Sequence, residues 1–404
     1  MSPGSPPLSA PIPWLRPYWF LAGLGLGLIA LGWAGRVVSR TDYHPDFVRF
    51  HPMISPEDAY YPTLDEMCAI ARSRCRPDQV LVIVGGNSIL LGIWQPEAEV
   101  WTKRLQQLLG DHYCVLNFAF RGASPTDGGA VVAEALRREF PRQILIVNEA
   151  AITAVDSFGR EPYRYVFWQG YFGGRLLDSV ARTTDIDLTV ADQAPLRRHL
   201  EEVRPSIWFD RVLHYQDLWN WVTFEWFGTL PSPREPAFPG YLRPRRLYPD
   251  PEVDGTSPVY AKDTYRPEAF PVEMQILRGP GPYYKQGPGG TWELAEVTRR
   301  DLSSHLASAF PDPLKPRTLV LLSQSSPFYR RHLTPLEGEL LQRSFDDSVQ
   351  IWRDAGYPCF AYGSNFVDAD YGDRIHLTKL GGWKLAAQVA PEVEELTRNL
   401  GYLK

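Results

Sequence analysis

A serine follows a short apolar run, at a position suited to a nucleophile. Residues 80–84 are Val-Leu-Val-Ile-Val, a run typical of a buried strand in a parallel sheet, and Gly85-Gly86-Asn87-Ser88 come directly after it. Ligands of open α/β sheets bind beyond the carboxyl ends of the strands. Ser88 is therefore a candidate nucleophile, although Gly-Gly-Asn-Ser is also ordinary turn sequence.

A candidate base and orienting acid lie near the other end of the chain. Asp373 and His376 are separated by two residues and precede an apolar helix predicted from Trp383 to Val389. A serine hydroxyl needs a base to accept its proton. That base works better when a carboxylate fixes its tautomer and stabilises its positive charge. These residue types predict a triad with Ser88. The alternative is that Asp373 caps the helix and His376 is an ordinary polar residue.

Strand and helix patterns alternate around these residues. The predicted strands are Val80–Val84, Tyr113–Phe118, Gln143–Val147, Thr318–Ser323 and Cys359–Tyr362. The predicted helices between them include Thr63–Ser73, Glu97–Leu109, Thr126–Arg138 and Pro335–Ala355. This alternation predicts a parallel sheet with helices on both faces.

Three polar or flexible residues follow successive strands of that sheet. Ser88, Gly122 and Asn148 would lie just beyond the strand ends, where a hydroxyl, a backbone N–H and an amide could converge on one oxyanion. Each has a plainer explanation by itself, because Gly122 suits a turn and Asn148 could cap a helix. Glu149 could act as an acid or base, but we expect it in a solvated loop.

Four motifs resemble those of SGNH (GDSL-type) hydrolases and occur in that family's order. Gly86-Asn87-Ser88 resembles the nucleophile block, and residues 117–124 and 144–149 resemble the second and third blocks. Asp373-x-x-His376-Leu-Thr-x-x-Gly381 resembles the last block and is the most specific. The resemblance implies a flavodoxin-like three-layer α/β/α parallel sheet. It also implies Ser88, His376 and Asp373 as catalytic residues, with the Ser88 and Gly122 N–H groups and Asn148 binding the oxyanion.

The motifs depart from the family pattern at several positions. Asn87 replaces the usual aspartate, Ala119 a common glycine, and Ile146 and Glu149 the usual glycine and aspartate. None of these changes removes a catalytic group. They leave open a function of another class, a non-catalytic SGNH-like component that binds polysaccharide or serves assembly in an envelope complex.

The amino-terminal region predicts a membrane anchor. Residues 1–16 are rich in proline and serine and are expected to form a disordered tail, whereas residues 17–35 carry no charge. At about 1.5 Å per residue the uncharged stretch spans about 28 Å, close to the hydrocarbon thickness of a bilayer. We predict a transmembrane helix over residues 17–38, which inserts into the lipid bilayer; a cleaved signal peptide is the alternative.

Two arguments about the membrane orientation of the chain lead to opposite predictions. The count of arginines flanking the apolar stretch favours a cytoplasmic carboxyl-terminal domain. Tethered members of the SGNH family instead act outside the cytoplasm on cell-surface polymers. We follow the resemblance and expect an extracytoplasmic catalytic domain.

The chain is expected to divide around a large irregular insert. Residues 39–77 form a connecting segment and helix, 78–155 and 316–404 the two halves of the catalytic domain, and 156–315 an insert rich in aromatic residues and proline. We expect the insert to form a lid or one wall of the cleft. Its aromatic residues pack on the core, form a wall that stacks on sugars, or form a surface that dips into the lipid headgroups. The candidate substrate contacts are Asn87, Trp219, Trp221 and Trp226.

Composition excludes some partners. The net charge is −5 and no basic run occurs, so nucleic acid is not a predicted partner. The cysteines and histidines lack metal-ligand spacing, so neither a metal site nor a cofactor is predicted. Cys114 and Cys359 are expected to be core thiols. Cys68 and Cys75 are seven residues apart in a predicted helix, which is too far for a disulfide unless the helix breaks.

These observations predict a membrane-anchored serine esterase or O-acyltransferase. The resemblance implies that its substrates are acyl groups, above all acetyl groups, of a cell-surface polysaccharide. The resemblance also implies a partner, because a membrane-bound O-acyltransferase often supplies acyl groups to tethered relatives. A lipid-directed esterase or thioesterase is a further alternative and would require a deep apolar tunnel.

Overall fold

The computed structural model describes residues 17–44, 47–50, 62–120, 123–126, 128–150, 212–222, 284–287, 290–307, 309–310 and 312–403. Gly122, Trp226 and most of the predicted insert lie outside these residues.

A five-stranded parallel sheet organises the described chain. Its order is β2-β1-β3-β6-β7, and every neighbouring pair is parallel. The strands are β1 (Val80–Val84), β2 (Tyr113–Asn117), β3 (Gln143–Ala150), β6 (Thr318–Ser323) and β7 (Cys359–Tyr362). If the five strands of this sheet alone are counted in chain order, β6 is the fourth and β7 the fifth strand. The strand order is then that of flavodoxin-like folds, so the predicted fold class is confirmed. A separate antiparallel pair joins β4 (Tyr284–Gln286) to β5 (Trp292–Leu294).

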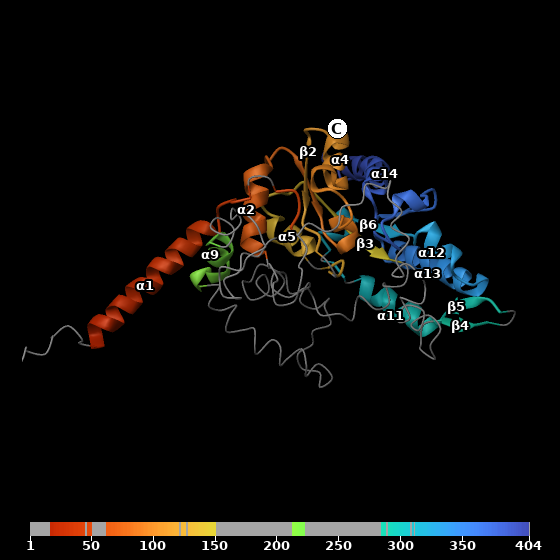
Figure 1. Ribbon diagram of the computed structural model, residues 1–404, viewed down its shortest axis with the longest axis horizontal. Coiled ribbons are helices and arrows are strands. Elements are labelled where there is room, and N and C mark those ends of the chain that lie inside the picture. The colour runs from red at the N-terminus through yellow and green to blue at the C-terminus, as the bar shows by residue number, and fades with distance from the viewer. Residues whose placement is uncertain are drawn as a thin grey trace, which may run out of the picture.

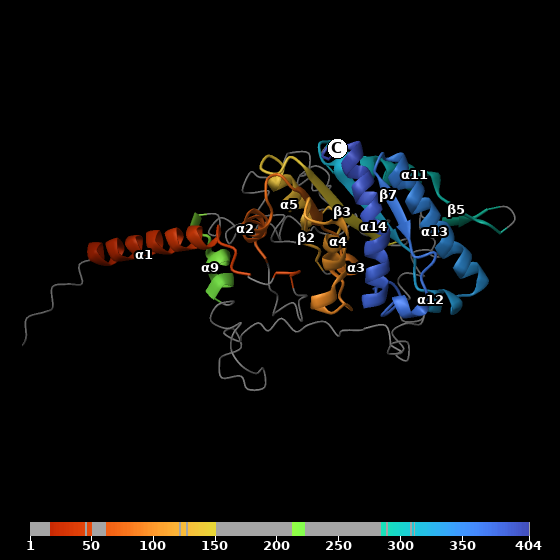
Figure 2. The ribbon, with the colours of Figure 1, turned by 90° about the horizontal axis from the view of Figure 1, so that it is seen from above.

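Helices cover both faces of the sheet and create two apolar layers. The α-helices are α1 (Pro17–Val38), α2 (Leu64–Arg74), α3 (Ser88–Leu91), α4 (Trp101–Leu109), α5 (Gly129–Leu136), α9 (Tyr215–Val222), α11 (Glu296–Ala307), α12 (Pro327–Arg331), α13 (Pro335–Asp354) and α14 (Lys379–Asn399). Helices α2, α5 and α13 cover one face, and α3, α4 and α14 cover the other (Figures 1 and 2). Their buried side chains form two separate apolar clusters, one on each face.

Strand β1 shows how its sequence fits this architecture. All five of its residues are buried. Leu81 and Ile83 belong to the layer with α2, while Val80, Val82 and Val84 belong to the layer with α4. Because both faces are covered, the strand is apolar throughout instead of alternating with polar residues.

Helix α1 differs from the other helices because its side chains are mostly exposed. It is the one described helix that is long and apolar enough to cross a membrane, with 6% of its most apolar window buried. Its 22 residues span about 33 Å. It projects from the α/β body, and its carboxyl-terminal end lies beside α9 (Figures 1 and 2).

Several local predictions need correction. The expected helix from Glu97 begins with a 3-10 turn, Glu97–Glu99, and α4 starts only at Trp101. Asn148 and Glu149 lie within β3, which stays paired with β6 through Ala150 after its pairing with β1 has ended. Glu149 is therefore buried in the sheet, with 1% of its surface exposed, and does not lie in a solvated loop.

The interpretation of the cysteines also needs correction. Cys75 lies just past α2, in extended backbone, and forms a disulfide with Cys114 of β2. The two Cα atoms are 5.6 Å apart, within the ordinary range for a disulfide. Cys114 is thus not a free core thiol, whereas Cys68 and Cys359 are free.

The disulfide predicts a measurable thiol count and a stability effect. Chain unfolded without reductant should expose two reactive thiols, and reduced chain should expose four. Closing a 39-residue separation restricts the unfolded chain, so Cys75→Ser should lower the free energy of unfolding by about 2–4 kcal/mol. Thiol titration in denaturant and urea unfolding test both effects. Four thiols before reduction would contradict the pairing.

Candidate active site

The predicted nucleophile, base and acid lie in one hydrogen-bonded chain. Ser88 is the first residue of α3, directly beyond the end of β1. Its Oγ lies 2.7 Å from Nε2 of His376, and Nδ1 of His376 lies 2.6 Å from Oδ2 of Asp373. The side chains of His376 and Asp373 are 17% and 18% exposed. This is the arrangement in which imidazole can accept the hydroxyl proton while a carboxylate holds its other nitrogen.

A tight loop presents the acid and the base. An antiparallel bridge between Tyr371 and Leu377 closes this loop. Within it, Oδ1 of Asp373 accepts hydrogen bonds from the backbone N–H groups of Ile375, at 2.9 Å, and His376, at 2.8 Å. Asp373 does not cap the next helix, because Thr378 is the N-cap of α14. The alternative explanation of the Asp-x-x-His motif as a helix cap is therefore wrong for Asp373.

The carboxylate of Asp373 is held in its ionised form. Burial by itself would raise its pKa, but the charge of His376 and the hydrogen bonds from His376 and Ile375 outweigh burial and hold the pKa well below its usual range. Trp94 adds a donor, since its Nε1 lies 2.8 Å from Oδ2 of Asp373. Asp373 is thus an anion at neutral pH and can stabilise an imidazolium.

Glycine at position 372 allows Trp94 to reach Asp373. A Cβ atom on Gly372 would lie 2.7 Å from the indole ring, closer than such atoms can approach. A side chain there would displace the ring and its Nε1 donor. The close contact between the Gly372 backbone and the indole ring therefore holds Nε1 of Trp94 beside the carboxylate of Asp373.

Asn87 and Asn148 brace the turn that carries the nucleophile. The backbone N–H of Asn87 donates to Oδ1 of Asn148 at 3.1 Å, and Nδ2 of Asn148 donates to Oδ1 of Asn87 at 2.9 Å. Oδ1 of Asn87 also accepts from the N–H of Ile89 at 3.0 Å and so caps α3. Backbone donors fix the orientation of both amides, because each side-chain oxygen faces an N–H.

The amide of Asn148 is fully buried behind this turn. Both ends of its side chain bind Asn87, so its visible contribution is to position the turn. Gly86 makes room for it with a φ of +81°, and a Cβ on Gly86 would overlap Oδ1 of Asn148. Donation from Asn148 to an oxyanion remains a prediction, as does donation from Gly122, which lies outside the described residues.

The candidate substrate contacts are distributed unevenly. Asn87 adjoins the nucleophile, whereas Trp219 and Trp221 lie on α9. The described contacts of α9 join it to α1 and α2, and α9 lies beside α1 in both views (Figures 1 and 2). Trp226 lies outside the described residues, so a substrate-binding role for the tryptophans remains a prediction.

Sequence reasoning missed two residues that support the site. Trp94 was not expected to meet Asp373, and Arg49 was not expected to be buried, with 4% of its surface exposed. Arg49 donates to the carbonyls of Leu91, at 2.8 Å, and Gln95, at 3.0 Å, and also to that of Gly92. It thus supplies hydrogen-bond donors to carbonyl groups at the carboxyl-terminal end of α3 and just beyond it. Neither residue belongs to a local motif, because their partners are remote in sequence.

Comparison with known proteins adds little to this geometry. No protein-family model matches the chain, and no curated protein matches it. Two solved structures are similar, those of M. smegmatis aryl esterase in inhibitor-bound and native forms. Each is 13% identical, with 78% of this chain and 99% of the other covered, and the TM-scores are 0.30 and 0.29. Likeness at this level carries no information about activity.

Asn87 offers a direct test of the brace. Asn87→Asp keeps the oxygen that binds Asn148 and Ile89, so labelling of Ser88 by a fluorophosphonate, a reagent for activated serines, should stay within about threefold of wild type. Asn87→Ala removes that oxygen and should slow labelling at least about tenfold. Equal labelling rates for Asn87→Ala and Asn87→Asp would show that the side-chain oxygen of Asn87 does not position the turn that carries Ser88.

Trp94 tests the support of the acid. Trp94→Phe keeps an aromatic ring but loses the donor to the charged Asp373, so labelling of Ser88 should slow about tenfold. Trp383→Phe is the matched control, because its indole donates to the carbonyl of Glu99 at the surface. If both variants label like wild type, the hydrogen bond from Trp94 does not position the acid.

Proposed function

We propose that this chain is a membrane-anchored serine esterase or O-acyltransferase that works through an acyl-serine intermediate. One observation carries the proposal: Ser88, His376 and Asp373 form a continuous hydrogen-bonded chain at the end of a parallel strand. The SGNH resemblance of the four motifs supports the same reaction class. A non-catalytic component would have no need of a base held within hydrogen-bond reach of the serine.

The chemistry follows from the roles of these three side chains. Oγ of Ser88 attacks the acyl carbonyl carbon, and its proton moves to Nε2 of His376. Asp373 stabilises the imidazolium through Nδ1. The tetrahedral intermediate then collapses, the leaving alkoxide takes the proton from His376, and the acyl group stays on Ser88.

A second half-reaction releases the acyl group. Water or a sugar hydroxyl gives a proton to His376 and attacks the carbonyl carbon of the acyl-serine. The bond to Oγ of Ser88 then breaks, His376 returns the proton to Oγ, and either a free acid or a new ester leaves. The oxyanion donors in this proposal are the N–H groups of Ser88 and Gly122, with Asn148. Hydrolase and transferase use the same residues, so the acceptor alone distinguishes them.

The proposed location has two supports. Helix α1 has the length and apolar surface of a membrane span. The disulfide between Cys75 and Cys114 supports an extracytoplasmic catalytic domain, because such bonds persist mainly in oxidising compartments. An acetylated cell-surface polysaccharide as substrate, and a membrane-bound O-acyltransferase as acyl donor, rest on the SGNH resemblance.

Ester hydrolysis by the full chain in detergent tests the proposal. We expect p-nitrophenyl acetate to be hydrolysed, with Ser88→Ala and His376→Ala each lowering kcat by at least about a thousandfold. The matched controls are Ser73→Ala and His332→Ala, which replace exposed residues of the same types and should keep wild-type rates. Folding of every variant is checked by circular dichroism.

Two results would overturn the proposal. A folded wild-type chain without esterase activity and without labelling by fluorophosphonates would favour a binding component. Activity that persists in Ser88→Ala would show that another group performs the reaction.

A further inference from the structure

A second polar site lies at the carboxyl-terminal end of α1. A cavity of about 670 Å³ opens there, between the end of α1, helix α2 and the residues that lead into α9. This volume is in the range of small-ligand sites. The charged or titratable side chains that line it are Arg36, Arg40, Asp65, Arg72 and His214.

Close packing of α1 against the start of α9 forms one wall of this cavity. Gly35 is buried, and a Cβ on it would overlap the carbonyl oxygen of Leu213 and lie 2.9 Å from Cβ of His214. The hydroxyl of Thr63 donates to Asp217, and Nδ2 of Asn220 donates to Glu66, so α9 is also fixed to α2. The cavity therefore lies where three helices, α1, α2 and α9, are held together by specific contacts.

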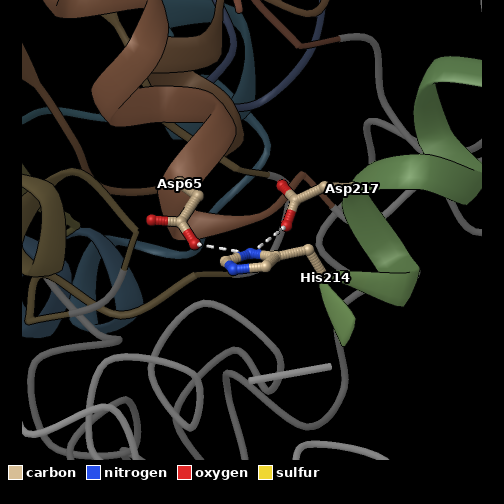
Figure 3. A group of neighbouring side chains, drawn as sticks. All are labelled: Asp65, His214 and Asp217. Carbon is tan, nitrogen blue, oxygen red and sulfur yellow. Dashed lines mark ion pairs between the residues drawn. The ribbon is translucent and has the colours of Figure 1, made fainter. Parts of the chain in front are cut away.

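His214 contributes a positive charge to the wall. Figure 3 shows its ring between Asp65 of α2 and Asp217 of α9, and its Nδ1 lies 3.6 Å and 3.5 Å from their nearest carboxylate oxygens. Asp217 and, next, Asp65 raise the pKa of His214 to about 9, against the lowering effect of burial. The imidazole is therefore a cation at neutral pH.

The arginines of the cavity differ in their existing partners. Arg72 makes two hydrogen bonds to the carboxylate of Glu139, at 2.6 and 2.7 Å. Among the described residues no ion pair involves Arg36 or Arg40, and both are exposed. Two guanidinium groups with no ion-pair partner among the described residues thus lie at the mouth of a cavity that is lined by four basic side chains and one carboxylate, that of Asp65.

These arginines also lie at a defined end of α1. Arg36 is in the last turn of the helix and Arg40 follows two residues after its end. If the apolar span of α1 crosses a bilayer, this end lies at the level of the lipid headgroups. Planar guanidinium groups bind phosphate oxygens through two parallel hydrogen bonds, which suits the phosphate of a lipid headgroup at this level of the membrane.

We propose that this cavity binds the phosphate group of an anionic phospholipid and thereby fixes the catalytic domain against the membrane surface. The inference rests on the proposed membrane insertion of α1 and is independent of the chemistry at Ser88. The rival ligand is a divalent cation, since Asp65, His214 and Asp217 offer three ligand atoms within 4.8 Å of one another. The arginines of the same cavity disfavour it, because they repel a cation.

Native mass spectrometry of the full chain in detergent tests the inference. We expect phosphatidylglycerol adducts to exceed those of phosphatidylcholine with the same acyl chains by at least about fivefold. The double variant Arg36→Gln/Arg40→Gln should abolish this preference. Arg353→Gln/Arg398→Gln removes the same charge from exposed positions on α13 and α14 and should keep it.

Competition and metal-binding experiments distinguish the lipid from the other possible ligands. Inorganic phosphate at millimolar concentration should displace little lipid; complete displacement would overturn the lipid assignment in favour of a free anion. Loss of the preference in both double variants would show a general charge effect and would also overturn it. Stoichiometric binding of Mn²⁺ or Zn²⁺ that Asp217→Asn abolishes would establish the cation site instead.

Two checks separate this inference from the proposed function. Extraction of membranes with alkaline carbonate reports whether α1 is inserted, and release of the chain would remove the basis of the lipid assignment. Fluorophosphonate labelling of the same samples reports Ser88 independently. Labelled protein without lipid preference would overturn only the lipid site.

Discussion

The hydrogen bond between Ser88 and His376 joins residues 288 positions apart, and it depends on the parallel sheet and the loops that hold those two side chains together. Ser88 is placed by β1, which pairs with β2 on one side and β3 on the other. His376 is placed by a bridged loop directly before α14, and α14 packs on the same face of the sheet as α3 and α4. An error in the register of the sheet would move the serine away from its base.

Two close contacts refine this placement. On the nucleophile's side, Asn148 of β3 binds both the backbone and the side chain of Asn87. On the acid's side, Trp94 donates to Asp373 and packs on Gly372. Asn87 occupies a position where SGNH hydrolases usually have aspartate, yet its oxygen still caps α3 and accepts from Asn148. Asparagine at this position therefore keeps both hydrogen bonds that an aspartate oxygen could accept there.

The sequence predicted the parts of the fold whose signals are local. The predicted bounds of β1 and β6 match the structure residue for residue, because a strand covered on both faces carries a continuous apolar run, Val80–Val84 in β1 and residues 319–322 in β6. The Asp-x-x-His motif and the turn at Ser88 are likewise short. Contacts between remote residues were not predictable in this way, and the Trp94–Asp373 hydrogen bond is the clearest case. Cys75 was assigned to a helix that in fact ends at Arg74, so its disulfide with Cys114 was missed.

The central claim is that Ser88 is an activated nucleophile, and mapping a covalent adduct tests it most directly. The full chain would be treated with a fluorophosphonate, digested, and sequenced by tandem mass spectrometry. The account predicts one adduct per chain, on Ser88, which is absent when His376 is replaced by alanine. A folded chain that carries no adduct, or carries it on another residue, would contradict the account.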